Sequence, residues 1–335
     1  MLENLHGNVC EITAIERQAP ATILANFSTT MNNTQPPSCI NPTAEKIGKT
    51  SSYFLIFFVS LIGNILIGVI VFRTPTMRRP INFFIVNMAM SDLLFPLFQF
   101  PRTVTELYVD TWMIRGPFGM ALCKIVPFLG IVSALVSIQS LVLIAVDRFG
   151  AVFFPLRCPL SSSKLCGVLI LATWVIAMLV MWPNMSSYEL VESPGGLACQ
   201  RQWKETFGEP FSFNNYILAL FVAFSYVPLV AIAILYLAIL LKLRSQSHKI
   251  RDEQSLNAGD IRARREQNVL KMSIAIVLTF AICWLPLSIY FVMILHSLNS
   301  SMLRSCGFQY FDAIVFFVWH SNCAINPCKI GRAHV

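Results

Sequence analysis

An aspartate, Asp92, lies in the middle of an apolar run, residues 80–101, that contains no other charged residue. A carboxylate at the centre of a bilayer costs about 2.5–3.5 kcal/mol on insertion scales, so its side chain must face polar partners. Polar residues of other apolar runs can supply them: Asn64, Ser137, Asn322 and Asn326. Asp92 is then either a protonated, hydrogen-bonded structural group or an ionised carboxylate that binds a small cation such as sodium, because hard cations prefer oxygen ligands.

An acid–base pair, Asp147-Arg148, closes a second apolar run, residues 125–146. Such a pair at a membrane boundary is usually solvated and contributes under about 1 kcal/mol. In a third run, Pro286 closely follows Trp284. A proline inside a helix removes a backbone hydrogen bond and kinks the helix, so these two residues form either a hinge or ordinary core packing.

Catalysis is not expected from these residues. His320 is the one histidine of its apolar run, Asp92 has no acidic partner in its own run, and none of the cysteines has zinc-site spacing. An intramembrane enzyme would need a catalytic set such as Ser/His or paired Asp, so the sequence argues against an enzyme. A transporter also uses buried charge and proline kinks, and it remains an alternative although internally repeated halves are lacking.

The elements that position these residues are long apolar runs. The chain has 335 residues, of which 56% are hydrophobic and 13% charged, whereas soluble domains carry about 25% charged residues. A hydrocarbon core about 30 Å thick needs about 20 helical residues, and backbone polar groups there must be satisfied within the helix. The sequence therefore predicts an all-α fold, a bundle of seven transmembrane helices. The predicted spans are 51–72, 80–101, 125–146, 165–188, 210–241, 272–295 and 305–328.

Charge and glycosylation signals predict the orientation of this bundle. Basic residues are concentrated in the three loops on one side, which places that side in the cytoplasm and the N-terminus outside a plasma membrane. The net charge of +8 follows from this bias beside anionic lipid, so no nucleic-acid partner is expected. Residues 1–50 form a polar extracellular tail, and residues 51–328 form the membrane domain. Glycosylation triplets on the outer side begin at Asn26, Asn32 and Asn184.

In order along the chain, these residues resemble the rhodopsin-like family of G-protein-coupled receptors, and neuropeptide receptors most of all. The resemblance runs from about Tyr53 to Pro327, and Phe149 stands where the family has tyrosine. The matching residues are Gly63-Asn64, Asp92, Asp147-Arg148-Phe149, Trp174, Pro228 with Tyr236, Cys283-Trp284-Leu285-Pro286, and Asn322 to Asn326-Pro327.

The resemblance implies a bundle that switches between two packings. Arg148, held by Asp147 and by Glu266, ties the third and sixth helices together at the inner side. An extracellular ligand releases the sixth helix outward, and a heterotrimeric G protein then binds, with arrestin as a further partner. The residues assigned to coupling and switching are Asp147, Arg148, Glu266, Tyr236, Trp284, Phe280, Pro228, Ile138, Pro286, Asn326 and Pro327.

The resemblance also implies an ion and disulfides. An allosteric sodium ion is expected at Asp92, Ser137, Asn322 and Asn326, and no other cofactor is expected. Cys123 and Cys199 match the extracellular disulfide of the family, and Cys39 with Cys306 matches a second bridge of some peptide receptors. Oxidation is permitted on that side of the membrane.

The C-terminal residues depart from the family. The chain leaves the family pattern directly after Asn326-Pro327-Cys328, before the expected tyrosine and the amphipathic inner helix. Residues 329–335 read as the translation of a common sequencing adapter. We therefore expect them to be non-native sequence and the natural chain to run on beyond Cys328.

The ligand is expected to be a peptide. Amine receptors carry an aspartate in the third helix where this chain has Gly130 beside Ile131, and opsins need a lysine in the seventh helix, which here offers His320. A long polar tail and a long second outer loop favour a peptide, with a lipid or another non-amine small molecule as the alternative. The ligand-pocket candidates are Gly130, Ile131, Trp284, His320, Glu189 and Glu192.

Overall fold

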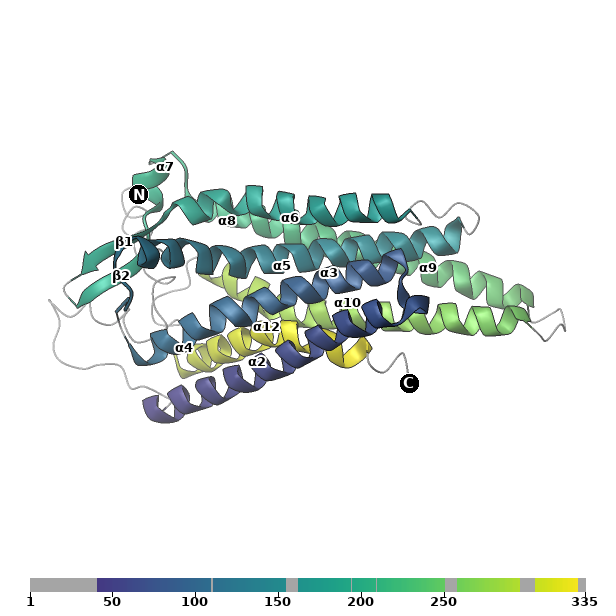
Figure 1. Cartoon of the computed structure of the whole chain (residues 1–335), viewed down its shortest axis with the longest axis horizontal. Coiled ribbons are helices and arrows are strands. Elements are labelled where there is room, and N and C mark those ends of the chain that lie inside the picture. Colours follow the sequence, from purple (N-terminus) through teal and green to yellow (C-terminus); the bar gives the residue numbers. More distant parts are fainter. Residues whose placement is uncertain are drawn as a thin grey trace.

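The computed structural model describes residues 41–109, 111–154, 162–193, 195–208, 210–250, 258–295 and 305–330. Within them, long helical segments run side by side as one bundle, with a small hairpin at one end (Figure 1). This confirms the predicted all-α fold. The long segments are α2 (Pro42–Arg73), α3 (Pro80–Leu94), α4 (Phe100–Tyr108), α5 (Gly116–Phe153), α6 (Ser163–Ser186), α8 (Phe213–Phe221), α9 (Val227–Ile250), α10 (Ala258–Leu295) and α12 (Cys306–Ile330).

Short elements complete the fold. The π-helical turns η2 (Phe95–Gln99) and η4 (Val222–Tyr226) join α3 to α4 and α8 to α9, so that each pair forms one continuous rod. Seven such rods stand in the described residues, one for each predicted span. The others are the 3-10 turn η1 (Pro75–Met77), the strands β1 (Tyr188–Ser193) and β2 (Gly196–Arg201), and the helix α7 (Trp203–Phe207).

The first rod begins earlier than the predicted span, at Pro42 rather than Ser51. Asn41 caps it, because its side-chain oxygen accepts hydrogen bonds from the backbone N–H groups of Thr43 and Ala44 at 2.9 and 3.3 Å. Proline at the first helical position costs nothing, since its missing N–H would have no helical partner there. Caps and polar first turns extend a membrane helix beyond its apolar run, which is why runs alone underestimate its length.

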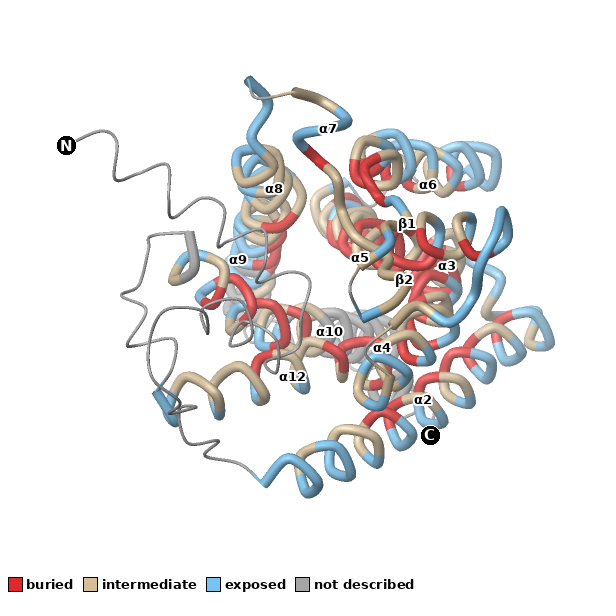
Figure 2. The backbone as a smooth tube through the Cα atoms, turned by 90° about the vertical axis from the view of Figure 1, so that its left-hand side faces the viewer, coloured by how far each residue is buried: buried red, intermediate tan, exposed pale blue. Residues whose placement is uncertain are grey.

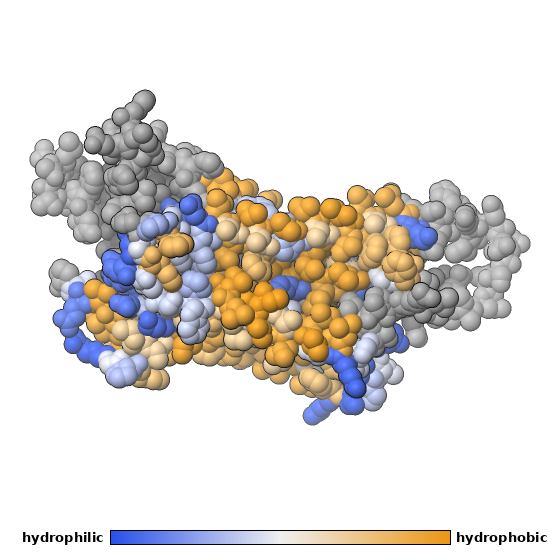
Figure 3. Space-filling view, turned by 90° about the horizontal axis from the view of Figure 1, so that it is seen from above, coloured by the Kyte–Doolittle hydropathy of each residue, from blue (hydrophilic) through white to orange (hydrophobic). Residues whose placement is uncertain are grey.

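The exterior of the bundle is suited to lipid. Buried positions lie on the sides of the helices that face one another, and exposed ones lie on the perimeter (Figure 2). Large apolar side chains such as Leu55 (67% exposed) and Ile282 (65%) stand on that perimeter. A hydrophobic surface covers the middle of the molecule, with hydrophilic residues toward both ends (Figure 3). In water such a surface would aggregate, whereas in a bilayer it is solvated by lipid tails.

Length and composition agree with this arrangement for most rods. Among the described residues, five helical segments are long and apolar enough to cross a membrane, and Val277–Met293 in α10 is a shorter apolar stretch. The five are Pro42–Arg73, Pro80–Tyr108, Gly116–Phe153, Ser163–Ser186 and Phe213–Leu243. The remaining rod, α12, packs against α2 and α10, so it belongs to the same bundle.

Prolines within the rods are accommodated in two ways. Pro96 lies inside η2, and Pro228 is the second residue of α9, which follows η4. A π-turn contains one extra residue per turn and is a known cause of helix bending. Pro127, Pro183 and Pro286 instead lie inside helices that stay α-helical.

Asn87 ties three rods together in the core. Its Nδ2 donates to Ser140 Oγ of α5 at 2.9 Å and to Thr173 Oγ1 of α6 at 3.2 Å, and its Oδ1 accepts from Trp174 Nε1 at 2.8 Å. Asn87 is 4% exposed, so these bonds satisfy all the hydrogen-bonding directions that burial would otherwise leave unpaired. The matched family tryptophan, Trp174, is thereby a polar partner as well as a packing residue.

We predict that Asn87→Leu destabilises the protein. The change keeps the side-chain size but leaves Trp174 Nε1 without its acceptor, and should cost about 2 kcal/mol. The thermal midpoint of the detergent-purified protein is expected to fall by roughly 5 °C. Met90→Leu, on the lipid-facing side of the same helix (58% exposed), is the control. Equal midpoints for the two variants would contradict the role given to Asn87.

Candidate functional site

Asp92 lies on a seam of hydroxyl groups between α3 and α5. It is 2% exposed, and its carboxylate accepts a hydrogen bond from Ser137 Oγ. Ser137 Oγ also contacts Ser91 Oγ at 2.8 Å, and Ser133 Oγ donates to the Ser91 carbonyl at 2.7 Å. The structure thus brings the predicted partner Ser137 to Asp92, and adds two serines that the sequence did not single out.

The other side of Asp92 is closed by α2 and α12. Ser60 Oγ lies 3.1 Å from the Cys323 carbonyl and 3.5 Å from the Asp92 carbonyl. Asn64 does not reach the Asp92 carboxylate as expected; its Nδ2 donates to the Cys323 carbonyl at 2.9 Å. Asn322 is 8% exposed, and its Oδ1 has no hydrogen-bond partner in the described part of the chain. Asn326 belongs to α12, with a side chain outside the described residues.

Near the C-terminal end of α5, Asp147 forms an ion pair with Arg148. Arg148 donates to Asp147 Oδ2 from Nη2 at 2.6 Å and from Nε at 3.2 Å. Asp147 is 5% exposed, so this is a partly shielded, charge-assisted contact and stronger than a surface pair. Phe149, which replaces the family tyrosine, stacks on Phe153 with ring centroids 4.3 Å apart. The predicted second partner, Glu266, has a side chain outside the described residues.

An aromatic stack fills the core between these two polar sites. Phe280 and Trp284 of α10 stack with ring centroids 5.3 Å apart, and Phe221 of α8 lies 6.4 Å from Trp284. Ile138 and Phe280 are fully buried in the same cluster as Tyr236, while Pro228 is half-buried. Trp284 Nε1 is buried without a hydrogen-bond partner in the described residues. Pro286 lies within α10 beside this stack, and Pro327 lies in α12.

Two of the ligand-pocket candidates, Gly130 and Ile131, are neighbours on α5 but contact different parts of the bundle. Gly130 is buried on α5 and faces Gln99 of η2. Ile131 packs against the cluster of Phe128, Ala177 and Met181, which joins α5 to α6 and also includes Leu220 of α8.

His320 has become part of an aromatic wall. Its ring is 4% exposed, its Nδ1 lies against the Phe316 carbonyl, and its ring contacts are Tyr53, Phe95, Phe100, Phe316 and Trp319. His320 therefore shapes the interior and offers almost no surface to a ligand.

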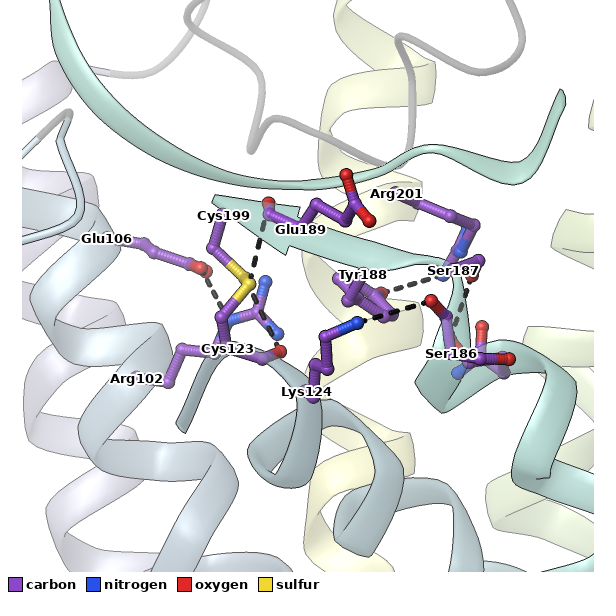
Figure 4. Close-up of a disulfide and its surroundings, with 11 residues drawn as sticks. Arg102, Glu106, Cys123, Lys124, Ser186, Ser187, Tyr188, Glu189, Cys199 and Arg201 are labelled. Carbon is purple, nitrogen blue, oxygen red and sulfur yellow. Dashed lines mark hydrogen bonds and ion pairs between the residues drawn. A yellow bond between two sulfur atoms is a disulfide. The ribbon is translucent and has the colours of Figure 1, made fainter. Parts of the chain in front are cut away.

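A hairpin lies at the end of the bundle where α5 begins, and a disulfide bonds it to α5. Strands β1 and β2 pair antiparallel with Leu190 opposite Cys199. The predicted disulfide between Cys123 and Cys199 is confirmed, with Cα atoms 5.6 Å apart (Figure 4). Glu189 and Glu192 are exposed on β1, as expected of a rim.

The remaining outer-side predictions have mixed outcomes. Cys306 is disulfide-bonded, and its predicted partner Cys39 lies outside the described residues, as do the glycosylation candidates Asn26 and Asn32. The glycosylation prediction at Asn184 is wrong. Asn184 lies inside α6 and is 0% exposed, so a glycan cannot be attached to it in the folded protein.

A chain of cations and rings fixes the hairpin to the rods (Figure 4). Arg102 of α4 pairs with Glu106 at 2.7 Å. Arg201 of β2 donates to the Tyr188 hydroxyl at 2.7 Å, and its guanidinium lies 3.9 Å from the ring centroid of Phe213 in α8. Burial lowers the pKa of Arg201 to about 9, so it stays protonated at neutral pH. Burial also raises the pKa of Tyr188, which keeps this phenol neutral beside it.

The geometry defines a class of protein: a multi-pass membrane bundle with a buried carboxylate at mid-depth, an arginine at one end and a disulfide-bonded hairpin at the other. The family described as "7 transmembrane receptor (rhodopsin family)" matches residues 63–328. The chain belongs to this family. Membership confirms the prediction of a receptor and excludes the enzyme and transporter alternatives.

Similar proteins come from several animals. The QRFP-like peptide receptor of Branchiostoma floridae is 30% identical over 87% of this chain and 76% of its own length. The RYamide receptor of Drosophila melanogaster is 29% identical over 91% and 65%. Neuropeptide FF receptor 2 of Rattus norvegicus is 31% identical over 84% and 68%. The resemblance to neuropeptide receptors is thereby confirmed.

We predict that Arg201→Met loosens the hairpin. Methionine keeps an apolar stem but removes the cation that holds Tyr188 and Phe213, and backbone hydrogen exchange across residues 188–201 should speed up about tenfold. Arg115→Met, an exposed cation at the start of α5, is the control and should leave exchange unchanged. Identical exchange in both variants would show that the disulfide alone holds the hairpin.

Proposed function

We propose that this chain is a plasma-membrane receptor for an extracellular neuropeptide and that it activates a heterotrimeric G protein. The observation that carries the proposal is the disulfide-bonded hairpin, which presents two exposed acids, Glu189 and Glu192, at one end of the bundle. Relatives named as peptide receptors support the ligand class. Carboxylates on this rim favour a ligand with basic residues, because opposite charges steer association.

The proposed orientation of the receptor in the membrane rests on the two ends of α5. Cys123, near its start, is oxidised, as expected on the extracellular side. Arg148 lies near its end, and a rise of 1.5 Å per residue puts the two roughly 37 Å apart, enough to span the hydrocarbon core. The ligand end and the G-protein end are thus joined by one straight element, and the N-terminus lies outside.

Activation is a change of packing around the aromatic stack. Ligand binding shifts the contact of Trp284 and Phe280 with Ile138 and Pro228, and α10 swings outward about Pro286. The movement uncovers Arg148 and Tyr236, which then receive the α subunit of the G protein, and arrestin binds the same opened face. A ligand drives this shift only by binding the open packing more tightly than the closed one.

The residues around Asp92 also fit a sodium ion. The Asp92 carboxylate, the Ser137 hydroxyl and the buried Asn322 Oδ1 are oxygen donors of the kind that hard cations prefer, and Asn326 would complete the set. When bound, the ion neutralises the carboxylate. Without it, the carboxylate keeps the hydrogen bond from the Ser137 hydroxyl.

The proposal is tested by nucleotide exchange on G proteins in membranes from cells that express the receptor, challenged with a peptide library. At least one peptide should give saturable exchange, and Arg148→Ala should abolish it at equal surface expression. Silence to every peptide with a response to lipids would overturn the ligand class.

We predict that Asp147→Asn raises basal exchange several-fold. The change removes the charge that holds Arg148 at 2.6 Å and so lowers the energy gap to the open packing. Glu266→Ala should act in the same direction. Glu45→Gln, which breaks a half-buried pair with Lys49 at the outer end, is the control. Basal exchange no higher than in the control would count against the restraint on Arg148.

We predict that sodium raises the thermal midpoint of the purified receptor above that in potassium at matched ionic strength, because a ligand of the folded state stabilises it. Asp92→Asn should remove the difference. Asp312→Asn, which alters the other aspartate of an apolar run, should keep it. Equal stabilisation by both cations, or a sodium effect that survives in Asp92→Asn, would contradict the proposed sodium site.

A further inference from the structure

The side chain of Gln99, the last residue of η2, lies directly against Gly130 of α5. Its Oε1 is 3.3 Å, and its Cδ 3.8 Å, from the position that a Cβ atom of residue 130 would take. Any larger residue at 130 would push the carboxamide away. The absence of a side chain at Gly130 thus leaves space for the Gln99 carboxamide of the neighbouring rod, which the sequence alone did not show.

The approach of Gln99 to Gly130 lies nearer the hairpin than the Asp92–Ser137 hydrogen bond, between the same two rods. Gln99 follows Asp92 by seven residues, and Gly130 precedes Ser137 by seven, so about two helical turns, or roughly 10 Å, separate the two levels. The aromatic wall of His320 adjoins η2 at the same level through Phe95 and Phe100. The carboxamide therefore stands in the outer half of the bundle interior.

The carboxamide has hydrogen-bonding capacity to offer. Within the described residues it makes no hydrogen bond, although the Gln99 main-chain carbonyl accepts one from Thr103 Oγ1 at 2.9 Å. The side chain is only half-buried. A carboxamide carries two N–H donors and an oxygen acceptor, so a ligand that reaches this level meets all three.

The charges near Gln99 are already engaged. Outward along the same rod, Arg102 pairs with Glu106 at 2.7 Å. Inward, Asp92 accepts a hydrogen bond from Ser137. A charged ligand group at the level of Gln99 would lose its hydration without gaining a counter-charge, which is costly. A neutral amide, with a donor and an acceptor of its own, matches the carboxamide without that cost.

We propose that Gln99, given its space by Gly130, hydrogen-bonds a neutral amide of the ligand and so selects for it over a charged group. The inference rests on the proposed peptide ligand. The amide is either the terminal carboxamide of the peptide or one of its main-chain amides, two sources of the same chemistry.

The test uses synthetic peptides ending in Arg-Phe or Arg-Tyr, each made with a terminal carboxamide and with a free carboxylate, and reads nucleotide exchange by the receptor. Gln99→Leu should lower the potency of an active peptide about tenfold. A loss confined to the carboxamide form identifies the terminal group, and an equal loss in both forms identifies a main-chain amide. Leu97→Ala, a lipid-facing change in the same turn (43% exposed), should leave potency unchanged.

Gly130→Ala provides the second arm, because its Cβ stands 3.3 Å from Gln99 Oε1 and forces the carboxamide to shift by a few tenths of an ångström. It should reduce potency in the wild-type background and add no further loss in the Gln99→Leu background, since the two residues act as one unit. Additive losses would assign Gly130 a separate packing role and overturn the inference, as would unchanged potency in Gln99→Leu at equal surface expression. If no peptide of the library activates the wild-type receptor, the proposed function fails first and this inference with it.

Discussion

The hydrocarbon core supplies no hydrogen-bonding partners, so every polar group buried in this bundle must be satisfied by the protein itself. That constraint explains why its polar residues gather into seams rather than stand alone. Asp92 accepts a hydrogen bond from Ser137 of α5, and Asn87 binds two neighbouring helices at once. The backbone of α12 takes part as well, since the Cys323 carbonyl accepts from both Ser60 and Asn64. The packing of the rods follows from matching these groups as much as from filling space.

The sequence predicted those features whose signal is local and rare. A run of apolar residues long enough to span a membrane, one charge inside such a run, and a cysteine at the start of a helix are each visible without knowledge of the neighbours. The seven rods and the contact of Ser137 with Asp92 could therefore be predicted, whereas the Cys123–Cys199 pairing came from the resemblance to the family. The start of α2 at Pro42 and the π-turns η2 and η4 could not, because capping and bulging depend on few residues whose pattern also occurs in straight helices.

The errors share a single physical cause: the direction in which a side chain points is set by tertiary contacts. Asn184 has an acceptor triplet, yet α6 turns it into the core. Ile131 neighbours Gly130 in sequence but packs into a different group of side chains, the cluster of Phe128 and Met181. His320 was expected to be available to a ligand, and the rings around it cover it. In a helix whose every face is apolar, periodicity carries little information about which face is inward, so these assignments needed the packed structure.

The buried atoms without partners show where this packing is under tension. Within the described residues, Trp284 Nε1 and Asn322 Oδ1 are enclosed and make no hydrogen bond. Each such group costs free energy that a different arrangement of helices, a water molecule or an ion can recover. One lies in the aromatic stack of α10 and the other on α12, near the level at which Ser60 joins the Cys323 and Asp92 carbonyls. Other rods carry such groups too, since Gln139 Nε2 of α5 and both amide atoms of Asn184 in α6 are buried without a hydrogen-bond partner in the described residues. In the activation proposed above, α10 is the helix that moves, and its unsatisfied Trp284 Nε1 is the buried group that moves with it.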